Sequence, residues 1–167
     1  MKFLTDAMLG KLTRILRIFG YDTIYAEDIG HSVSDENLLE YAVKNDRIII
    51  TKDYPFFKKA GKDRCVYLSG KGVYNYLKQL KKALRLNYNF NINNARCSIC
   101  NSPLKHQRDK NIIEKQVKPE TLKHFTKFYQ CTNSKCGKIY WKGTHIDDIL
   151  EKLKKVQNSE DQLNNNK

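Results

Sequence analysis

The sequence predicts an α/β fold in which a parallel sheet is flanked by helices, followed by a small second unit near the C-terminus. Two observations predict it. Short strand-like segments alternate with helix-like segments from residue 2 to residue 86, and four cysteines fall in two close pairs between residues 97 and 136. At 167 residues the chain is long enough for one domain of ordinary size with a small appendage.

Four short segments rich in apolar or β-branched residues predict strands, namely 2–5, 21–26, 47–51 and 64–68. Apolar residues at helical spacing predict helices over 9–19, 38–43 and 73–84. Gly20 supplies a stop for the first helix, and Ser34 is a good N-cap for the second. The polar stretch 27–33, with Gly30, reads as a loop.

Alternating strands and helices favour a parallel sheet, because parallel neighbours need crossover connections. Residues 87–95, NYNFNINNA, lack helical periodicity and mark the domain boundary. We therefore expect an α/β domain over 1–90 and a cysteine-bearing unit with a C-terminal helix over 91–157. The polar, Asn-rich end, 158–167, is expected to be disordered.

The chain is strongly basic, with a formal net charge of +13 and a pI near 9.5. A polyanion such as nucleic acid is the simplest partner for such a charge; a generic lysine-rich surface is the alternative. No apolar run is long enough to span a membrane and the N-terminus lacks a signal core, so the expected location is the cytoplasm. The sequence indicates no oligomeric state.

The cysteines have the spacing of a metal site. Cys97 and Cys100 form a C-x2-C pair, and Cys131 and Cys136 form a C-x4-C pair. Two such turns complete a tetrahedral site, which predicts one structural zinc ion with no open position for chemistry. Disulfides are the alternative, but they are rare in the cytoplasm. The fifth cysteine, Cys65, lies in a predicted strand and is expected to be a buried core thiol.

Acidic residues follow two of the predicted strands. Asp6 and Asp53 each come after a strand end, where ligands bind in open parallel sheets. Asp35 and Glu36 begin the helix that precedes the strand leading to Asp53, so at least one of them can face the same crevice. Carboxylates that converge in this way select Mg²⁺ or Mn²⁺, which are used in phosphodiester hydrolysis. Helix capping is the alternative for each acid.

Two groups of residues are candidates for contact with nucleic acid. Lys11, Arg14 and Arg17 share the polar side of the first helix and could form a phosphate track; a solvated charged face is the alternative. The second group follows the second cysteine pair and could bind phosphates and stack on bases, although packing is the alternative for its aromatic members. It consists of Lys138, Tyr140, Trp141, Lys142 and His145.

Several segments together resemble the Mut-7 C-terminal ribonuclease domain family, a PIN-like nuclease fold joined to a zinc ribbon. They are FLTDAMLGKLTRILRIFGYDT, SDENLL, IIITKD, CSIC and CTNSKCGKIYWKGTH, and the resemblance covers nearly the whole chain. It implies a metal-dependent RNase whose acids fall on Asp6, Asp35 and Asp53, with Glu36 beside them.

These observations together favour the hypothesis that the protein is a Mg²⁺- or Mn²⁺-dependent endoribonuclease whose zinc ribbon binds RNA. The alternative is a non-catalytic RNA-binding or ribosome-associated module whose acids are structural. A zinc-ribbon DNA-binding regulator is weaker, because it gives the acidic crevice no role.

Overall fold

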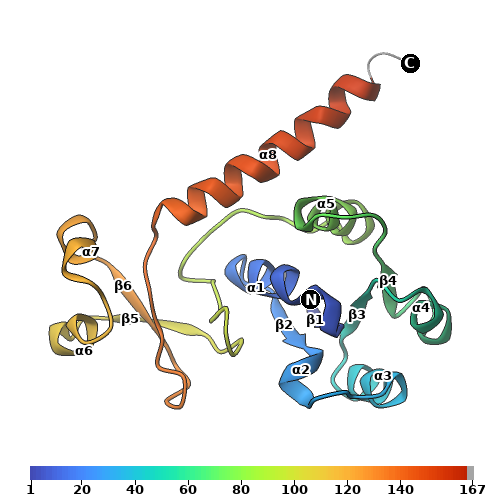
Figure 1. The fold of residues 1–167 in the computed structure, drawn as a ribbon, viewed down its shortest axis with the longest axis horizontal. Helices are drawn as coiled ribbons and strands as arrows, with labels where there is room; N and C mark the ends of the chain where they lie inside the picture. Colours follow the sequence, from blue (N-terminus) through green and yellow to red (C-terminus); the bar gives the residue numbers. More distant parts are fainter. Residues whose placement is uncertain (165–167) are drawn as a thin grey trace.

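A four-stranded parallel sheet forms the centre of the N-terminal domain. The computed structural model describes residues 1–164, and side chains as far as residue 155. The strands are β1 (Lys2–Thr5), β2 (Asp22–Tyr25), β3 (Ile48–Thr51) and β4 (Cys65–Tyr67), in the order β2-β1-β3-β4 (Figure 1). All neighbours are parallel, as the alternating sequence pattern predicts.

Helices cover both faces of this sheet. One face carries α1 (Gly10–Ile18), α5 (Val73–Leu84) and α8 (Thr144–Asn164), which bury Phe3 and Ile50 of the sheet (Figure 1). The other face carries α2 (Ala26–Ile29), α3 (Asp35–Lys44) and α4 (Tyr54–Ala60), which bury Leu4, Ile49 and Cys65. The expected α/β architecture with a parallel sheet flanked by helices is therefore confirmed.

Helices α1, α3 and α5 begin and end close to where the sequence pattern predicts. The Ser34 hydroxyl accepts a hydrogen bond from the Asn37 amide and so caps α3. Three short helical segments of this domain were not predicted: η1 (Ala7–Leu9), α2 and α4. They are too short to show a helical repeat, and α2 falls in the segment expected to be a loop. Cys65 is buried, as expected.

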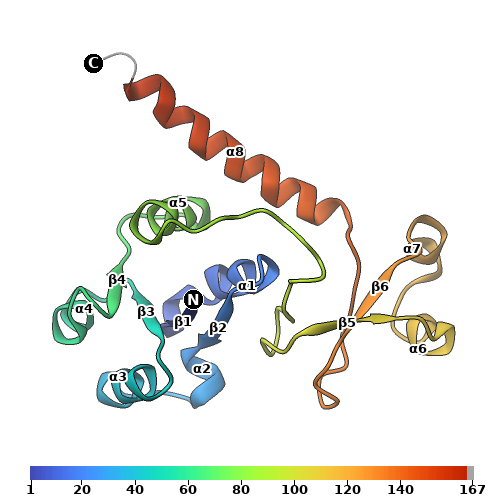
Figure 2. The ribbon, with the colours of Figure 1, turned by 180° about the vertical axis from the view of Figure 1, so that it is seen from behind.

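A second, antiparallel sheet carries the cysteines. Its strands β5 (Leu104–Gln107), β6 (Phe128–Cys131) and β7 (Ile139–Tyr140) lie in the order β5-β6-β7. Helices α6 (Lys110–Glu114) and α7 (Pro119–His124) are inserted between β5 and β6 (Figure 2). Ile113, Val117, Phe128 and Ile139 form a small separate core beneath them. We call residues 96–141 the cysteine module.

Helix α8 belongs to the first domain in space, although it follows the cysteine module in sequence. Helix α8 contacts α5 (Figure 1), and its residues Ile149 and Leu153 are buried in the same core as α1 and α5. Grouping this helix with the cysteine module was therefore wrong. The expected disordered tail is also corrected for residues 158–164, which continue α8. Once a helix has formed, each added residue gains a hydrogen bond, which offsets the poor propensities of this stretch. Residues 165–167 lie outside the described chain.

Candidate active site and metal centre

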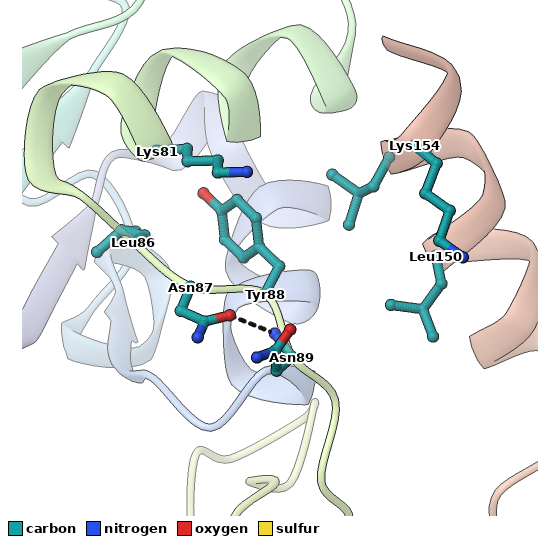
Figure 3. A pocket seen from close by; sticks show the side chains of 8 residues that line it. Lys81, Leu86, Asn87, Tyr88, Asn89, Leu150 and Lys154 are labelled. Atoms are coloured by element: carbon teal, nitrogen blue, oxygen red, sulfur yellow. Dashed lines mark hydrogen bonds between the residues drawn. The ribbon is translucent and has the colours of Figure 1, made fainter. Parts of the chain in front are cut away.

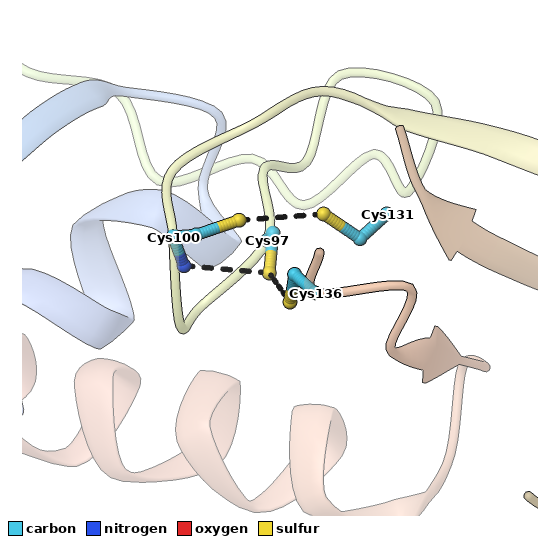
Figure 4. Close-up of side chains that lie close together, drawn as sticks. All are labelled: Cys97, Cys100, Cys131 and Cys136. Atoms are coloured by element: carbon cyan, nitrogen blue, oxygen red, sulfur yellow. Dashed lines mark hydrogen bonds between the residues drawn. The ribbon is translucent and has the colours of Figure 1, made fainter. Parts of the chain in front are cut away.

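The four predicted zinc ligands come together in one cluster. The Sγ atoms of Cys97, Cys100, Cys131 and Cys136 all lie within 4.8 Å of one another (Figure 4). The Cys97–Cys136 pair is 3.6 Å apart and the Cys100–Cys131 pair 3.3 Å, and all four thiols are free. A tetrahedral site with Zn–S bonds of about 2.3 Å places its sulfurs about 3.8 Å apart, whereas a disulfide requires about 2.05 Å. The cluster could therefore hold a zinc ion.

Each cysteine pair lies on a tight turn that ends in a left-handed residue. Asn101, with φ 65°, and Gly137, with φ 55°, each directly follow the second cysteine of a pair. In the first turn the Asn101 amide donates to the Cys97 carbonyl at 2.9 Å, and the Cys100 amide points at the Cys97 sulfur at 3.5 Å. A backbone amide directed at sulfur, as that of Cys100 is, stabilises a thiolate ligand.

Arg17 connects the first cysteine turn to the α/β domain. Its guanidinium donates hydrogen bonds to the carbonyl oxygens of Thr23, Ser98 and Ile99, and it forms an ion pair with Asp28 at 2.5 Å. The residue is only 2% exposed. Arg17 is therefore unavailable to nucleic acid, and its expected place in a phosphate track was wrong. Its position on a polar helix face concealed the partners that arrive from residues 98 and 99.

Asn101 joins the same turn to the edge of the sheet. Its side-chain oxygen accepts a hydrogen bond from the Thr23 amide at 3.1 Å, and its amide nitrogen donates to the Asp22 carboxylate at 2.8 Å. Burial works to raise the pKa of Asp22, but hydrogen bonds from Arg47 and Asn101 outweigh it and hold that pKa below its usual value. Strand β2 lies at the edge of the sheet, and the cysteine module covers part of its free side through Asn101. Without this contact, that side of the strand would face solvent.

The three aspartates singled out in the sequence line one pocket. Asp6, Asp35 and Asp53 border a cavity of about 340 Å³ at the carboxyl ends of β1 and β3. This is the edge at which open parallel sheets bind their ligands. The structure thus places Asp6, Asp35 and Asp53, which come from separate segments, around one pocket.

Two of these aspartates also cap helical turns. One oxygen of Asp6 accepts the Met8 amide at 2.8 Å, and the other accepts the Thr51 hydroxyl at 2.5 Å and the Lys52 amide at 2.9 Å. Asp53 accepts the Phe56 amide at 2.8 Å at the start of α4. Each carboxylate oxygen has two lone pairs, so capping leaves acceptor capacity for a cation.

Asp35 and its neighbour Glu36 have different surroundings. The pKa of Asp35 is raised, first because burial disfavours the charged form and then because the Asp53 carboxylate repels it. Asp35 does not cap α3, because Ser34 does. Glu36 is exposed, lies outside the pocket lining and pairs with Lys59, whose hydrogen bond lowers the pKa of Glu36 to about 2. The structure therefore brings Asp35, and not Glu36, together with the other aspartates.

A fourth acidic residue in this pocket was not predicted from the sequence. Glu27 belongs to α2 and lines the same cavity, together with His31 and Ser32. The signal that could have found it is its position two residues after the end of β2, the same edge that pointed to Asp6 and Asp53. It was missed because 27–33 read as a polar loop.

The acidic pocket has the oxygen donors that a hard cation prefers, but its carboxylates are less closely grouped than the cysteine sulfurs. In the described part of the chain, the cysteines are the one group of three or more His, Cys, Asp or Glu side chains close enough to hold a metal ion on their own. Mg²⁺ keeps several water ligands and commonly uses only one or two carboxylates, so widely placed acids suit it.

A second and larger cavity has different chemistry. It measures about 450 Å³ and lies between α5, the segment 86–89 and α8 (Figure 3). Tyr88, Leu150 and Leu153 supply apolar walls, and Lys81 and Lys154 its charges. Its lining contains no carboxylate, so it offers no site for a divalent cation.

The expected RNA contacts of the cysteine module divide into two groups. Lys138, Lys142 and His145 are exposed. The Tyr140 hydroxyl lies 3.1 Å from the Cys97 sulfur, and the partly buried Trp141 packs on the module's small core. The two aromatic rings therefore have the packing role that the sequence left open as an alternative.

On α1, Lys11 and Arg14 are exposed, as a phosphate track requires.

A comparison with known protein families identifies the family of this chain. The family model of the Mut7-C RNAse domain matches residues 1–153. The chain belongs to the Mut7-C RNAse domain family. Membership indicates an RNase-type function with RNA as the substrate. No curated protein and no solved structure matches the chain. Within the described residues, no helix has the length and apolarity needed to cross a membrane.

Proposed function

We propose that this member of the Mut7-C RNAse domain family is an endoribonuclease that depends on Mg²⁺ or Mn²⁺. One observation carries the proposal: Asp6, Asp35 and Asp53 border a single pocket at the carboxyl edge of a parallel sheet. The raised pKa of Asp35 supports it, because carboxylates that repel one another are stabilised by a cation between them. The proposal includes one structural zinc ion on the four cysteines.

The aspartates would hold the divalent ion together with bound water, with one or two carboxylates as direct ligands, and Glu27 is a further acid on the pocket wall. A bound ion of this kind activates water and neutralises charge on a scissile phosphate. The chain itself fixes the ligands in place. Thr51 and the Lys52 amide orient the Asp6 carboxylate, and the start of α4 orients Asp53. Preorganised ligands of this kind avoid reorganisation during the reaction.

The test uses Asp53→Asn and a mixed RNA pool, with and without Mn²⁺. Asparagine is as good an N-cap as aspartate, so the variant keeps α4 but loses the negative charge. We expect wild type to cleave only with Mn²⁺, leaving 5′-phosphate ends, and the variant to lose cleavage while retaining RNA binding. Asp6→Asn is a less clean variant, because asparagine cannot accept at both of the positions that Asp6 uses.

A non-catalytic RNA-binding module is the second candidate. The capping hydrogen bonds of Asp6 and Asp53 favour it, because they give both acids a structural role without any metal. The same experiment separates the two functions. Equal behaviour of wild type and Asp53→Asn with Mn²⁺ would favour the binding module.

A further inference from the structure

Three aromatic side chains beside the acidic pocket form one exposed cluster. Tyr54 lies 5.4 Å from Tyr67 and 6.1 Å from Phe57, and Phe57 lies 5.8 Å from Tyr67, measured between ring centroids. We call these three residues the aromatic platform. Phe57 is partly buried against the core beneath α4 and so anchors the two tyrosines. The platform is therefore a fixed surface and not a set of free side chains.

The exposure of this platform is unusual for the chain. Tyr54 is 50% exposed and Tyr67 36%. In the part of the chain whose side chains are described, they are the only exposed members among all phenylalanine, tyrosine and tryptophan residues. Exposed aromatic clusters are a common mark of a binding surface. The aromatic residues expected to bind RNA, Tyr140 and Trp141, are by contrast used in packing.

The platform is next to residues that line the acidic pocket. Tyr54 directly follows Asp53, which lines that pocket. Tyr67 ends β4 and pairs in register with Thr51, whose hydroxyl bonds to Asp6. Residues in register on parallel strands point to the same face of the sheet. An RNA strand held at the aspartates is therefore placed to extend onto the platform.

The charge around the platform suits a polyanion. Lys58 Nζ lies 5.6 Å from the centroid of the Tyr54 ring. Aromatic rings beside cationic side chains are the combination that binds single-stranded nucleic acid, in which bases stack and phosphates pair with lysines. A double-stranded RNA does not offer its base faces in this way.

We propose that the aromatic platform stacks unpaired bases of the RNA strand next to the bond that is cleaved, so that the enzyme prefers single-stranded RNA. This proposal rests on the endoribonuclease function. The platform supplies affinity by stacking and is independent of the metal ligands. It requires no contact from the aromatic rings of the cysteine module.

The experiment compares Tyr54→Ser/Tyr67→Ser with the ring-retaining control Tyr54→Phe/Tyr67→Phe. Binding is measured without added divalent ions, using a fluorescein-labelled single-stranded RNA, the same strand annealed to its complement, and a strand with abasic positions. We expect the serine variant to bind the single strand roughly 5- to 100-fold more weakly, since each stacked base contributes that much. The phenylalanine control should match wild type.

Three further results are expected. Duplex affinity should be the same for all proteins, the salt dependence of single-strand binding should not change, and abasic RNA should bind equally to wild type and the serine variant. The proposal would be overturned if a folded serine variant bound single-stranded RNA as tightly as wild type, or if it lost as much affinity for the duplex as for the single strand. In either case, metal-dependent cleavage by wild type would leave the proposed endoribonuclease function standing. Wild type that neither binds nor cleaves RNA would overturn both. Circular dichroism and a thermal melt establish that each variant is folded.

Discussion

Replacing Arg17 with methionine tests whether the cysteine module and the α/β domain are joined by one buried guanidinium. Arg17 donates four hydrogen bonds, two of them to carbonyls of the first cysteine turn and one to the Asp28 carboxylate. Removing one member of a buried ion pair costs about 3–5 kcal/mol. The Asp28 side chain is 34% exposed, which relieves part of that cost, so we expect a loss of about 3 kcal/mol.

For a chain of this size, 1 kcal/mol corresponds to about 2–4 °C in Tm, so the Tm of Arg17→Met should fall by about 6–12 °C. Arg14→Met is the matched control, because Arg14 is exposed on the same helix, and such changes stay within about 0.5 kcal/mol. Thermal unfolding followed by circular dichroism measures both. If the two variants melt together, Arg17 does not hold the joint.

Three other predictions concern the metal sites and the basic surface. Wild type and Cys65→Ser should contain about one zinc per chain by elemental analysis, whereas Cys131→Ser should contain none, because Cys65 is buried away from the cluster. Because the pKa of Asp35 is raised in the folded protein, its charged form destabilises the fold above that pKa. The Tm of metal-free Asp35→Asn should therefore be higher than that of wild type at neutral pH. This difference in Tm should vanish as the pH falls below 3.8, the ordinary pKa of aspartate. A variant that melts below wild type at neutral pH would contradict this sign. Lys11→Ala/Arg14→Ala should reduce the slope of log affinity for single-stranded RNA against log salt by about 1.4, since each neutralised phosphate contributes about 0.7; an unchanged slope would assign these residues to a merely solvated face.

The sequence predicted the parts of the fold that have a clear repeat. The strands of the parallel sheet alternate with helices whose apolar faces are long enough to recognise, and the cysteine spacing specified the cluster. Short helices such as α2 and α4 leave no such repeat, and that is why Glu27 was taken for a loop residue. The position of α8 depends on a long-range contact of Ile149 with the first core, which local patterns do not contain.

The candidate site shows the same division between local and long-range information. Strand ends pointed to Asp6 and Asp53, because the carboxyl edge of a parallel sheet can be inferred from strand order alone. Arg17 was misjudged because its partners at residues 98 and 99 come from a distant segment. The choice between Asp35 and Glu36 likewise depended on a distant residue, Lys59, which pairs with Glu36 outside the pocket.

The central claim is that the aspartate pocket is the site of metal-dependent RNA cleavage, and the rate of Mn²⁺-dependent cleavage in Asp35→Asn tests it most directly. Asp35 lines the pocket without capping its helix, while the adjacent Glu36 lies outside the pocket and serves as the matched control as Glu36→Gln. We expect Asp35→Asn to lose at least about 100-fold in rate, as when a preorganised transition-state contact is removed, and Glu36→Gln to retain the wild-type rate. Equal rates for Asp35→Asn and wild type would contradict the account.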